Sequence, residues 1–176
     1  MMDLSRPPDL GGREVRWIDL HHEGDGSELD SPAIIRHGAM SRTDQHFGDI
    51  PYHIVIWRPV VKADDQPAPL PGNPWAIDAG RPLSDWPASV KPEQAPNHNP
   101  HAIAIVVAGR WDREPLPTEA RDRLVEVLVW LVRHLGLPVE AIQGHREVCR
   151  DPHYTVCPGY DPGEIRALVR ALVGAP

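Results

Sequence analysis

The stretch "HAIAIVVAG", residues 101–109, determines the fold of this chain. From Ala102 to Ala108 every side chain is apolar, and most are β-branched. A continuous apolar run of this length is typical of a strand covered on both faces, whereas a half-exposed strand alternates apolar and polar residues. The run therefore predicts the central strand of an α/β domain, ending at Gly109.

Four further segments are expected to join this strand in a sheet. The first of them is rich in β-branched and aromatic residues and runs directly into His21 and His22. The mixed spacing of strands and helices argues against a purely parallel sheet. The four segments are "VRWIDLHH" (15–22), "YHIVIW" (52–57), "NPWAIDAG" (73–80) and "VEAIQGH" (139–145).

Three helices are predicted from capping residues and apolar spacing. The longest repeats apolar residues at i, i+4, i+7 and i+8, and Gly136 follows it at a C-cap position. Segments 61–72 and 81–100, rich in proline and polar residues, are expected to be loops of the kind that line a binding site. These patterns predict an α/β fold, a single three-layer domain with a central mixed β-sheet flanked by helices. The predicted helices cover about 32–42, 118–135 and 161–173.

Length and charge limit the class of protein. A chain of 176 residues suits one domain with a full core. The formal net charge of -7 and the lack of a Lys/Arg cluster exclude a nucleic-acid-binding protein, because phosphate binding needs a concentrated basic surface. The sequence has neither a long apolar span nor a signal-peptide pattern. We therefore expect no membrane insertion, and a cytoplasmic protein as synthesised.

Candidate metal ligands stand at both ends of the chain. His21 follows the first strand, and "GHREVCRDPHYTVCPGYD" (144–161) places His145, Cys149 and Cys157 in one polar stretch. A catalytic zinc site takes three ligands from histidine, cysteine and carboxylate and leaves one position open. His21, His145 and Cys157 would fit that pattern. Residue types alone leave the ordinary alternative open, because the chain has 10 histidines and most histidines bind no metal.

The sequence as a whole resembles the zinc-dependent N-acetylmuramoyl-L-alanine amidases of type 2, which include the peptidoglycan recognition proteins and phage lysozyme-type amidases. The resemblance extends over about residues 15–173 and implies an amidase domain over 15–176 after an N-terminal extension, 1–14. It rests on five blocks that occur in the family's order: "IDLHHEGDG", "DIPYHIVI", "HAIAIVVAG", "GHREV" and "TVCPGYD".

The resemblance implies a site and a reaction. The family's Zn²⁺ ligands fall on His21, His145 and Cys157, and its catalytic tyrosine falls on Tyr52. Thr155 occupies the position of a residue that assists many members, where its hydroxyl could donate a hydrogen bond to the oxyanion. The reaction would be hydrolysis of the amide between N-acetylmuramic acid and L-alanine in peptidoglycan.

Two features depart from the family pattern, and Cys149 matches none of the family's ligand positions. The interval between His145 and Cys157 is longer than in the family, so the residues from Cys149 onward are expected to bulge into solvent as an extra loop. Cys149 is expected to be a free thiol, with a disulfide to Cys157 as the alternative. The family's Gly-Ala-His-Ala element is missing, and His98 or His101 is the candidate to replace its histidine.

Two other functions stay open at this point. One is a non-catalytic protein that binds peptidoglycan or muropeptide, and the other is a domain in which zinc is purely structural. In either case peptidoglycan or muropeptide is the expected partner, and we expect a monomer. For the enzyme, we expect a phage or prophage endolysin that acts on the cell wall after release.

Overall fold

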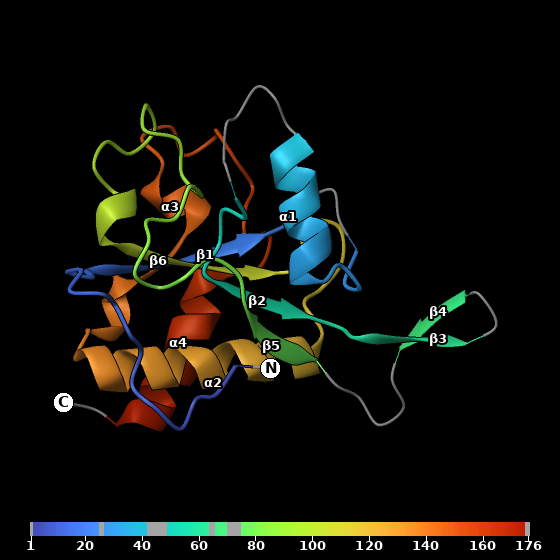
Figure 1. The fold of residues 1–176 in the computed structure, drawn as a ribbon. Coiled ribbons are helices and arrows are strands. Elements are labelled where there is room, and N and C mark those ends of the chain that lie inside the picture. Colours follow the sequence, from blue (N-terminus) through green and yellow to red (C-terminus); the bar gives the residue numbers. More distant parts are fainter. Residues whose placement is uncertain (1, 25–26, 42–48, 64–65, 70–74, 175–176) are drawn as a thin grey trace.

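The computed structural model describes residues 2–24, 27–41, 49–63, 66–69 and 75–174. Within these residues a five-stranded sheet has the order β5-β2-β6-β1-β7 (Figure 1). All neighbouring strands are parallel except β5, which runs antiparallel to β2. The mixed sheet that the sequence predicts is therefore confirmed. The strands are β1 (Trp17–His22), β2 (Ile54–Trp57), β5 (Ala76–Ala79), β6 (Ala102–Val107) and β7 (Ile142–Gly144).

Strand β6, the first segment recognised in the sequence, lies at the centre of the sheet. All six of its residues are buried, and it pairs with β1 on one side and β2 on the other. Its odd and even residues contribute to different clusters: Ile105 belongs to one apolar cluster and Val106 to the other. Burial on both faces explains why the segment has no polar alternation.

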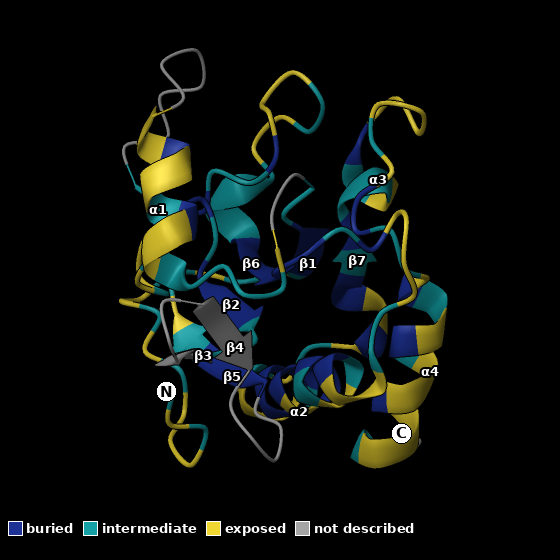
Figure 2. Ribbon diagram, turned by 90° about the vertical axis from the view of Figure 1, so that its right-hand side faces the viewer, coloured by how far each residue is buried: buried dark blue, intermediate teal, exposed yellow. Residues whose placement is uncertain are grey.

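Helices cover both faces of the sheet (Figures 1 and 2). Helix α2 (Thr118–Leu135) and helix α4 (Pro162–Val173) pack on one face over the larger apolar cluster. Helix α1 (Pro32–Ser41) and the short α3 (His145–Val148) lie on the opposite side, where Ile35 joins the smaller cluster. The three-layer prediction is confirmed, as is the C-cap at Gly136, which has a φ of 63° and donates to the Val132 carbonyl.

The alternation of side chains along β1 sets the position of the site. Ile18 and Leu20 belong to the cluster under α2 and are fully buried. Because successive side chains of a strand point to opposite faces, Asp19 and His21 project to the face that carries α1 and α3. Burial of these polar side chains lowers the stability of the fold unless they are hydrogen-bonded or paired with an opposite charge.

One segment differs from the sequence-based expectation. The predicted loop 61–72 contains a hairpin, β3 (Val60–Ala63) and β4 (Gln66–Pro69), and its residues 64–65 and 70–72 lie outside the described part. Proline is compatible with β4 because Pro67 and Pro69, two residues apart, share one edge, and the outer edge of a two-stranded ribbon needs no donor. The helix predicted over about 32–42 is confirmed as far as Ser41, and residues 42 and 73–74 of the predicted elements lie outside the described part.

The N-terminal segment is folded onto the domain. The Met2 N–H donates to the Ile77 carbonyl at 2.7 Å, and the Trp130 indole N–H donates to the Arg6 carbonyl at 2.8 Å. The Arg13 guanidinium donates to the Ala102 carbonyl at 2.8 Å, at the start of β6. The division at residue 14 stays a prediction. Among the described helices, none is long and apolar enough to cross a membrane.

Candidate metal centre

The sheet topology brings two histidines together. Strands β1 and β7 are parallel neighbours in which Leu20 is paired with Gly144, so the residues that follow each of these lie side by side. Those residues are His21 and His145, and their ring centroids are 4.7 Å apart. Two histidines separated by more than a hundred positions thus meet at the carboxyl ends of adjacent strands.

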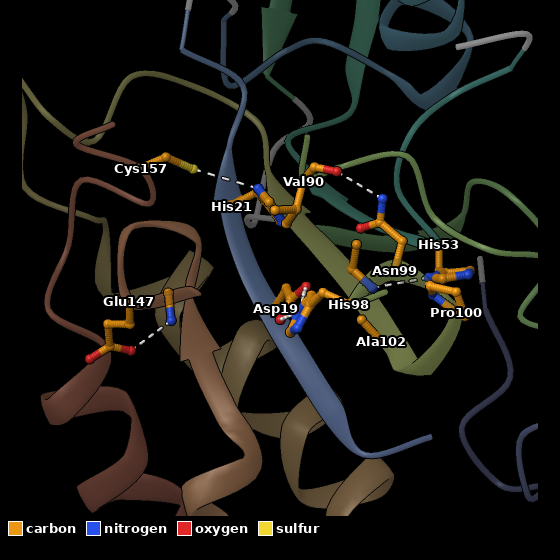
Figure 3. A network of polar contacts seen from close by, with 12 residues as sticks. Asp19, His21, His53, Val90, His98, Asn99, Pro100, Ala102, Glu147 and Cys157 are labelled. Carbon is orange, nitrogen blue, oxygen red and sulfur yellow. Dashed lines mark hydrogen bonds and ion pairs between the residues drawn. The ribbon is translucent and has the colours of Figure 1, made fainter. Parts of the chain in front are cut away.

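Cys157 reaches the same place from the segment that follows α3. Its Sγ lies 3.7 Å from His21 Nδ1 (Figure 3) and accepts the His22 backbone N–H at 3.3 Å. The Cys157 carbonyl accepts the Arg146 N–H at 2.9 Å, which ties the cysteine to the start of α3. Gly159, with a φ of +85°, lets this segment lie directly against the backbone of Trp111.

The three side chains form a group that fits a metal ion. One ligand atom from each of His21, His145 and Cys157 lies within 4.8 Å of the other two. His21 and Cys157 are buried, and the Nε2 atoms of both histidines are buried without a hydrogen-bond partner. Buried nitrogens without partners are costly, so a ligand that accepts their lone pairs would stabilise the site. Two imidazoles and a thiol are zinc ligands.

The protonation states of the ligands also suit a cation. Burial lowers the pKa of His21 well below its usual value, and it lowers the pKa of His145 to about 4, so both rings are neutral at pH 7. Burial raises the pKa of the Cys157 thiol to about 12 in the protein without metal. A metal ion must therefore displace one proton, from Cys157, when it binds.

A cavity opens beside His145, one of the three candidate ligands. It has a volume of about 250 Å³, and both His145 and Tyr52 line it. The Tyr52 ring lies 5.2 Å from the His21 ring, centroid to centroid, so the predicted catalytic tyrosine is next to the ligand group. The other residues that line the cavity are Glu23, Ile35, Gly38, Ala39, Pro51, Ala88, Ser89, Lys91 and Tyr154.

Thr155 lies in the turn that carries Cys157. Its Oγ1 accepts the Cys157 backbone N–H at 3.1 Å, so the hydroxyl orients the ligand's backbone. The hydroxyl hydrogen remains available for donation. Its predicted role toward an oxyanion stays a prediction.

The two histidines proposed as replacements have other partners. His98 Nε2 lies 2.8 and 2.9 Å from the two carboxylate oxygens of Asp19, which is fully buried (Figure 3). His101 Nδ1 lies 3.1 Å from the Glu14 carbonyl oxygen. Neither is among the residues that line the cavity, and the replacement of the family histidine by one of them stays a prediction. His98 compensates the buried carboxylate on β1.

Cys149 is a free thiol, as predicted, and so is Cys157. The expectation that Cys149 faces solvent is wrong, because its side chain is only 8% exposed. Its N–H donates to the His145 carbonyl at 3.3 Å as the C-cap of α3, which directs the residue inward. The bulge begins one residue later, and Arg150–His153 are exposed.

Two supporting residues were not recognised from the sequence. Glu147 accepts the Gly144 N–H at 2.7 Å and pairs with Arg166 of α4 through both carboxylate oxygens, at 2.9 and 3.0 Å. The spacing Gly-x-x-Glu at a helix start is a capping-box signal that could have revealed it. The second is His53, whose Nδ1 accepts the Ala104 N–H at 3.0 Å and so links the residue before β2 to β6.

Comparisons with known proteins identify solved structures with a similar fold. By fold, the chain is similar to the N-acetylmuramoyl-L-alanine amidase LysC from Clostridium intestinale URNW, with 20% identity, a TM-score of 0.63, and coverage of 95% of this chain and 92% of that one. It is also similar to the endolysin of the Thermus scotoductus MAT2119 bacteriophage Ph2119, with 20% identity, a TM-score of 0.63, and coverage of 96% and 92%.

The same fold occurs in the Drosophila peptidoglycan recognition protein SD, with 22% identity, a TM-score of 0.59, and coverage of 94% of this chain and 87% of that one. The comparison with curated protein sequences gave no match. The family model described as N-acetylmuramoyl-L-alanine amidase matches residues 11–160, a range that contains all three candidate ligands. The chain therefore belongs to the N-acetylmuramoyl-L-alanine amidase family.

Proposed function

We propose that this protein hydrolyses the amide bond between N-acetylmuramic acid and the L-alanine of peptidoglycan, with Zn²⁺ as its cofactor. One observation carries the proposal: the ligand atoms of His21, His145 and Cys157 lie within 4.8 Å of one another, beside a cavity. Family membership supports the choice of substrate. The fully buried position of His21 supports a preformed site.

Each residue of the site would have a distinct role in this reaction. His21 and His145 are neutral and present lone pairs, and Cys157 supplies the only anionic ligand once its proton leaves. Zinc bound there supplies a Lewis acid that polarises the amide carbonyl and activates water near neutral pH. The Tyr52 hydroxyl borders the same cavity and would donate to the carbonyl oxygen as negative charge develops.

A comparison of the two cysteines tests this proposal. Cys157→Ser should lose both bound zinc and the release of peptide from purified peptidoglycan, because serine is a poor zinc ligand. Cys149→Ser removes a thiol of similar burial from the neighbouring turn and should keep both properties. Zinc content is measured by atomic absorption on dialysed protein. Full zinc occupancy in Cys157→Ser would contradict the assignment.

The non-catalytic alternative predicts a different result in the same experiment. A protein that only binds muropeptide would hold its ligand and release no peptide, with or without zinc. A purely structural metal would leave zinc fully enclosed by protein ligands, whereas three ligands beside a cavity leave room for substrate. As part of the proposal, the cell wall is the place of action, since it contains the intact substrate.

A further inference from the structure

The cavity beside the metal centre has one lysine in its lining. Lys91 is one of only two lysines in the sequence, and the net charge of the chain is -7. Several of the other lining residues are small or apolar, among them Gly38, Ala39 and Ala88, and Glu23 is the acidic residue of the lining. Lys91 is therefore the lining residue whose ammonium group can attract an anion.

Lys91 lies beside the extra loop after α3. Its Nζ lies 6.0 Å from the centre of the Tyr154 ring, within range of a cation–π contact. The two segments are also joined through Gln94, whose carbonyl accepts the Arg150 N–H at 3.1 Å and whose Oε1 accepts the Asp151 N–H at 3.4 Å. The segment between β5 and β6 and the segment after α3 therefore form one wall of the cavity.

Tyr154 and Lys91 line the same cavity as His145. A ligand whose amide lies beside His145 can therefore extend toward the ammonium group without leaving the cavity. The aromatic ring limits the conformations of the long lysine side chain, which reduces the entropy lost when an anion binds. The extra loop thus has a structural reason to carry an aromatic residue.

We propose that Lys91, positioned by Tyr154, binds a carboxylate of the substrate's stem peptide and makes the protein selective for peptides in which that carboxylate is free. The inference rests on the proposed function, since it identifies which form of the peptide the site accepts. An ammonium ion forms a charge-assisted hydrogen bond with a carboxylate, and a neutral carboxamide forms a weaker one. Among the residues that line the cavity, Lys91 alone is a lysine or arginine, so the preference depends on this residue.

The test uses two ligands that differ only in charge. They are N-acetylmuramoyl-L-alanyl-D-glutamate and its diamide, in which both free carboxyl groups are carboxamides. Binding to the zinc-stripped full chain is measured by isothermal titration calorimetry, so that the result does not depend on cleavage. Cleavage of both ligands by the zinc-loaded protein is then followed separately by chromatography.

We expect the wild type to bind the diacid about tenfold more tightly than the diamide, at the lower end of the range for a hydrogen bond to a charged group. Lys91→Met should remove that preference by weakening only the diacid, and Lys91→Arg should keep it. Lys62→Met, which removes the same charge from β3, should behave as wild type. Tyr154→Ala should reduce the preference, whereas Tyr154→Phe should preserve it.

Three outcomes would overturn the inference: equal weakening of both ligands by Lys91→Met, no preference in the wild type, or no binding of either ligand. If the wild type binds the diacid more tightly than the diamide but the zinc-loaded protein cleaves neither ligand, the proposed hydrolysis is refuted and the role of Lys91 is retained. Cleavage without a preference would refute only the role of Lys91.

Discussion

Replacing Gly159 with alanine should damage the metal centre without touching a ligand. Gly159 lies two residues after Cys157 and has a φ of +85°, which L side chains rarely adopt. A Cβ at this position would lie 2.4 Å from the Asp112 nitrogen and 2.4 Å from the Trp111 carbonyl carbon. Both are backbone atoms and cannot rotate away, so the turn that carries Cys157 must move.

The expected cost has two parts. A non-glycine residue in the left-handed region costs about 1–2 kcal/mol, and forcing an extra methyl group into a filled space costs about 1–3 kcal/mol more. Gly136→Ala is the matched control, because Gly136 also has a positive φ, +63°, but nothing lies within 4 Å of its Cβ position. It should show only the first part, about 1–2 kcal/mol.

Urea unfolding of the zinc-stripped proteins measures the free energy of unfolding, and competition with a chromogenic chelator measures zinc affinity. Gly159→Ala should be destabilised by about 2–5 kcal/mol and should bind zinc more weakly, because a shifted Cys157 loses its place beside His21. Gly136→Ala should bind zinc normally. Equal destabilisation of the two variants with unchanged zinc affinity would refute the view that this close contact holds the cysteine.

Three further predictions concern the site itself. Tyr52→Phe should retain zinc and fold but slow hydrolysis by about 10²–10³-fold, as expected for loss of one oxyanion donor; unchanged turnover would make Tyr52 a packing residue. Zinc binding at pH 7 should release about one proton per chain, because Cys157 has a pKa of about 12 without metal and both histidines are neutral. Calorimetry in buffers of different ionisation enthalpy measures the number of protons released. Zinc binding without proton release would exclude the Cys157 thiolate as a ligand. When the zinc-stripped protein is treated with a thiol oxidant and then given zinc again, the wild type should regain less activity than Cys149→Ser until a thiol reductant is added, because the oxidant would form a disulfide between Cys149 and Cys157. Equal recovery of activity by the two proteins would contradict this.

The parts of the fold that could be predicted are those in which local sequence and tertiary environment agree. The apolar run of β6 admits one interpretation, and the apolar face of α2 ends at a glycine that can take the left-handed C-cap. The candidate ligands were predicted from residue type, strand-end position and resemblance to a family. Their meeting follows from the pairing of β1 with β7, which no local pattern specifies.

The parts that could not be predicted concern residues whose environment is set by distant segments. Cys149 looked like the start of a solvent-exposed loop, but a hydrogen bond to the His145 carbonyl turns it inward. His98, a candidate for a substrate contact, has the buried carboxylate of Asp19 as its partner, and no local pattern indicates that pairing. Segment 81–100 is expected to line a binding site and Lys91 does line the cavity, but no pattern in the sequence indicates that Tyr154 lines it too.

Mass spectrometry of the products formed from purified peptidoglycan in ¹⁸O-labelled water tests the proposed hydrolysis most directly. With zinc-loaded protein, we expect stem peptides that begin with a free L-alanine amine and glycan whose lactyl carboxyl carries one ¹⁸O atom, because the C–N bond breaks and water supplies the oxygen. The Cys157→Ser variant should give neither product. Cleavage at any other bond, or no cleavage by a protein that holds zinc at His21, His145 and Cys157, would contradict the proposed function.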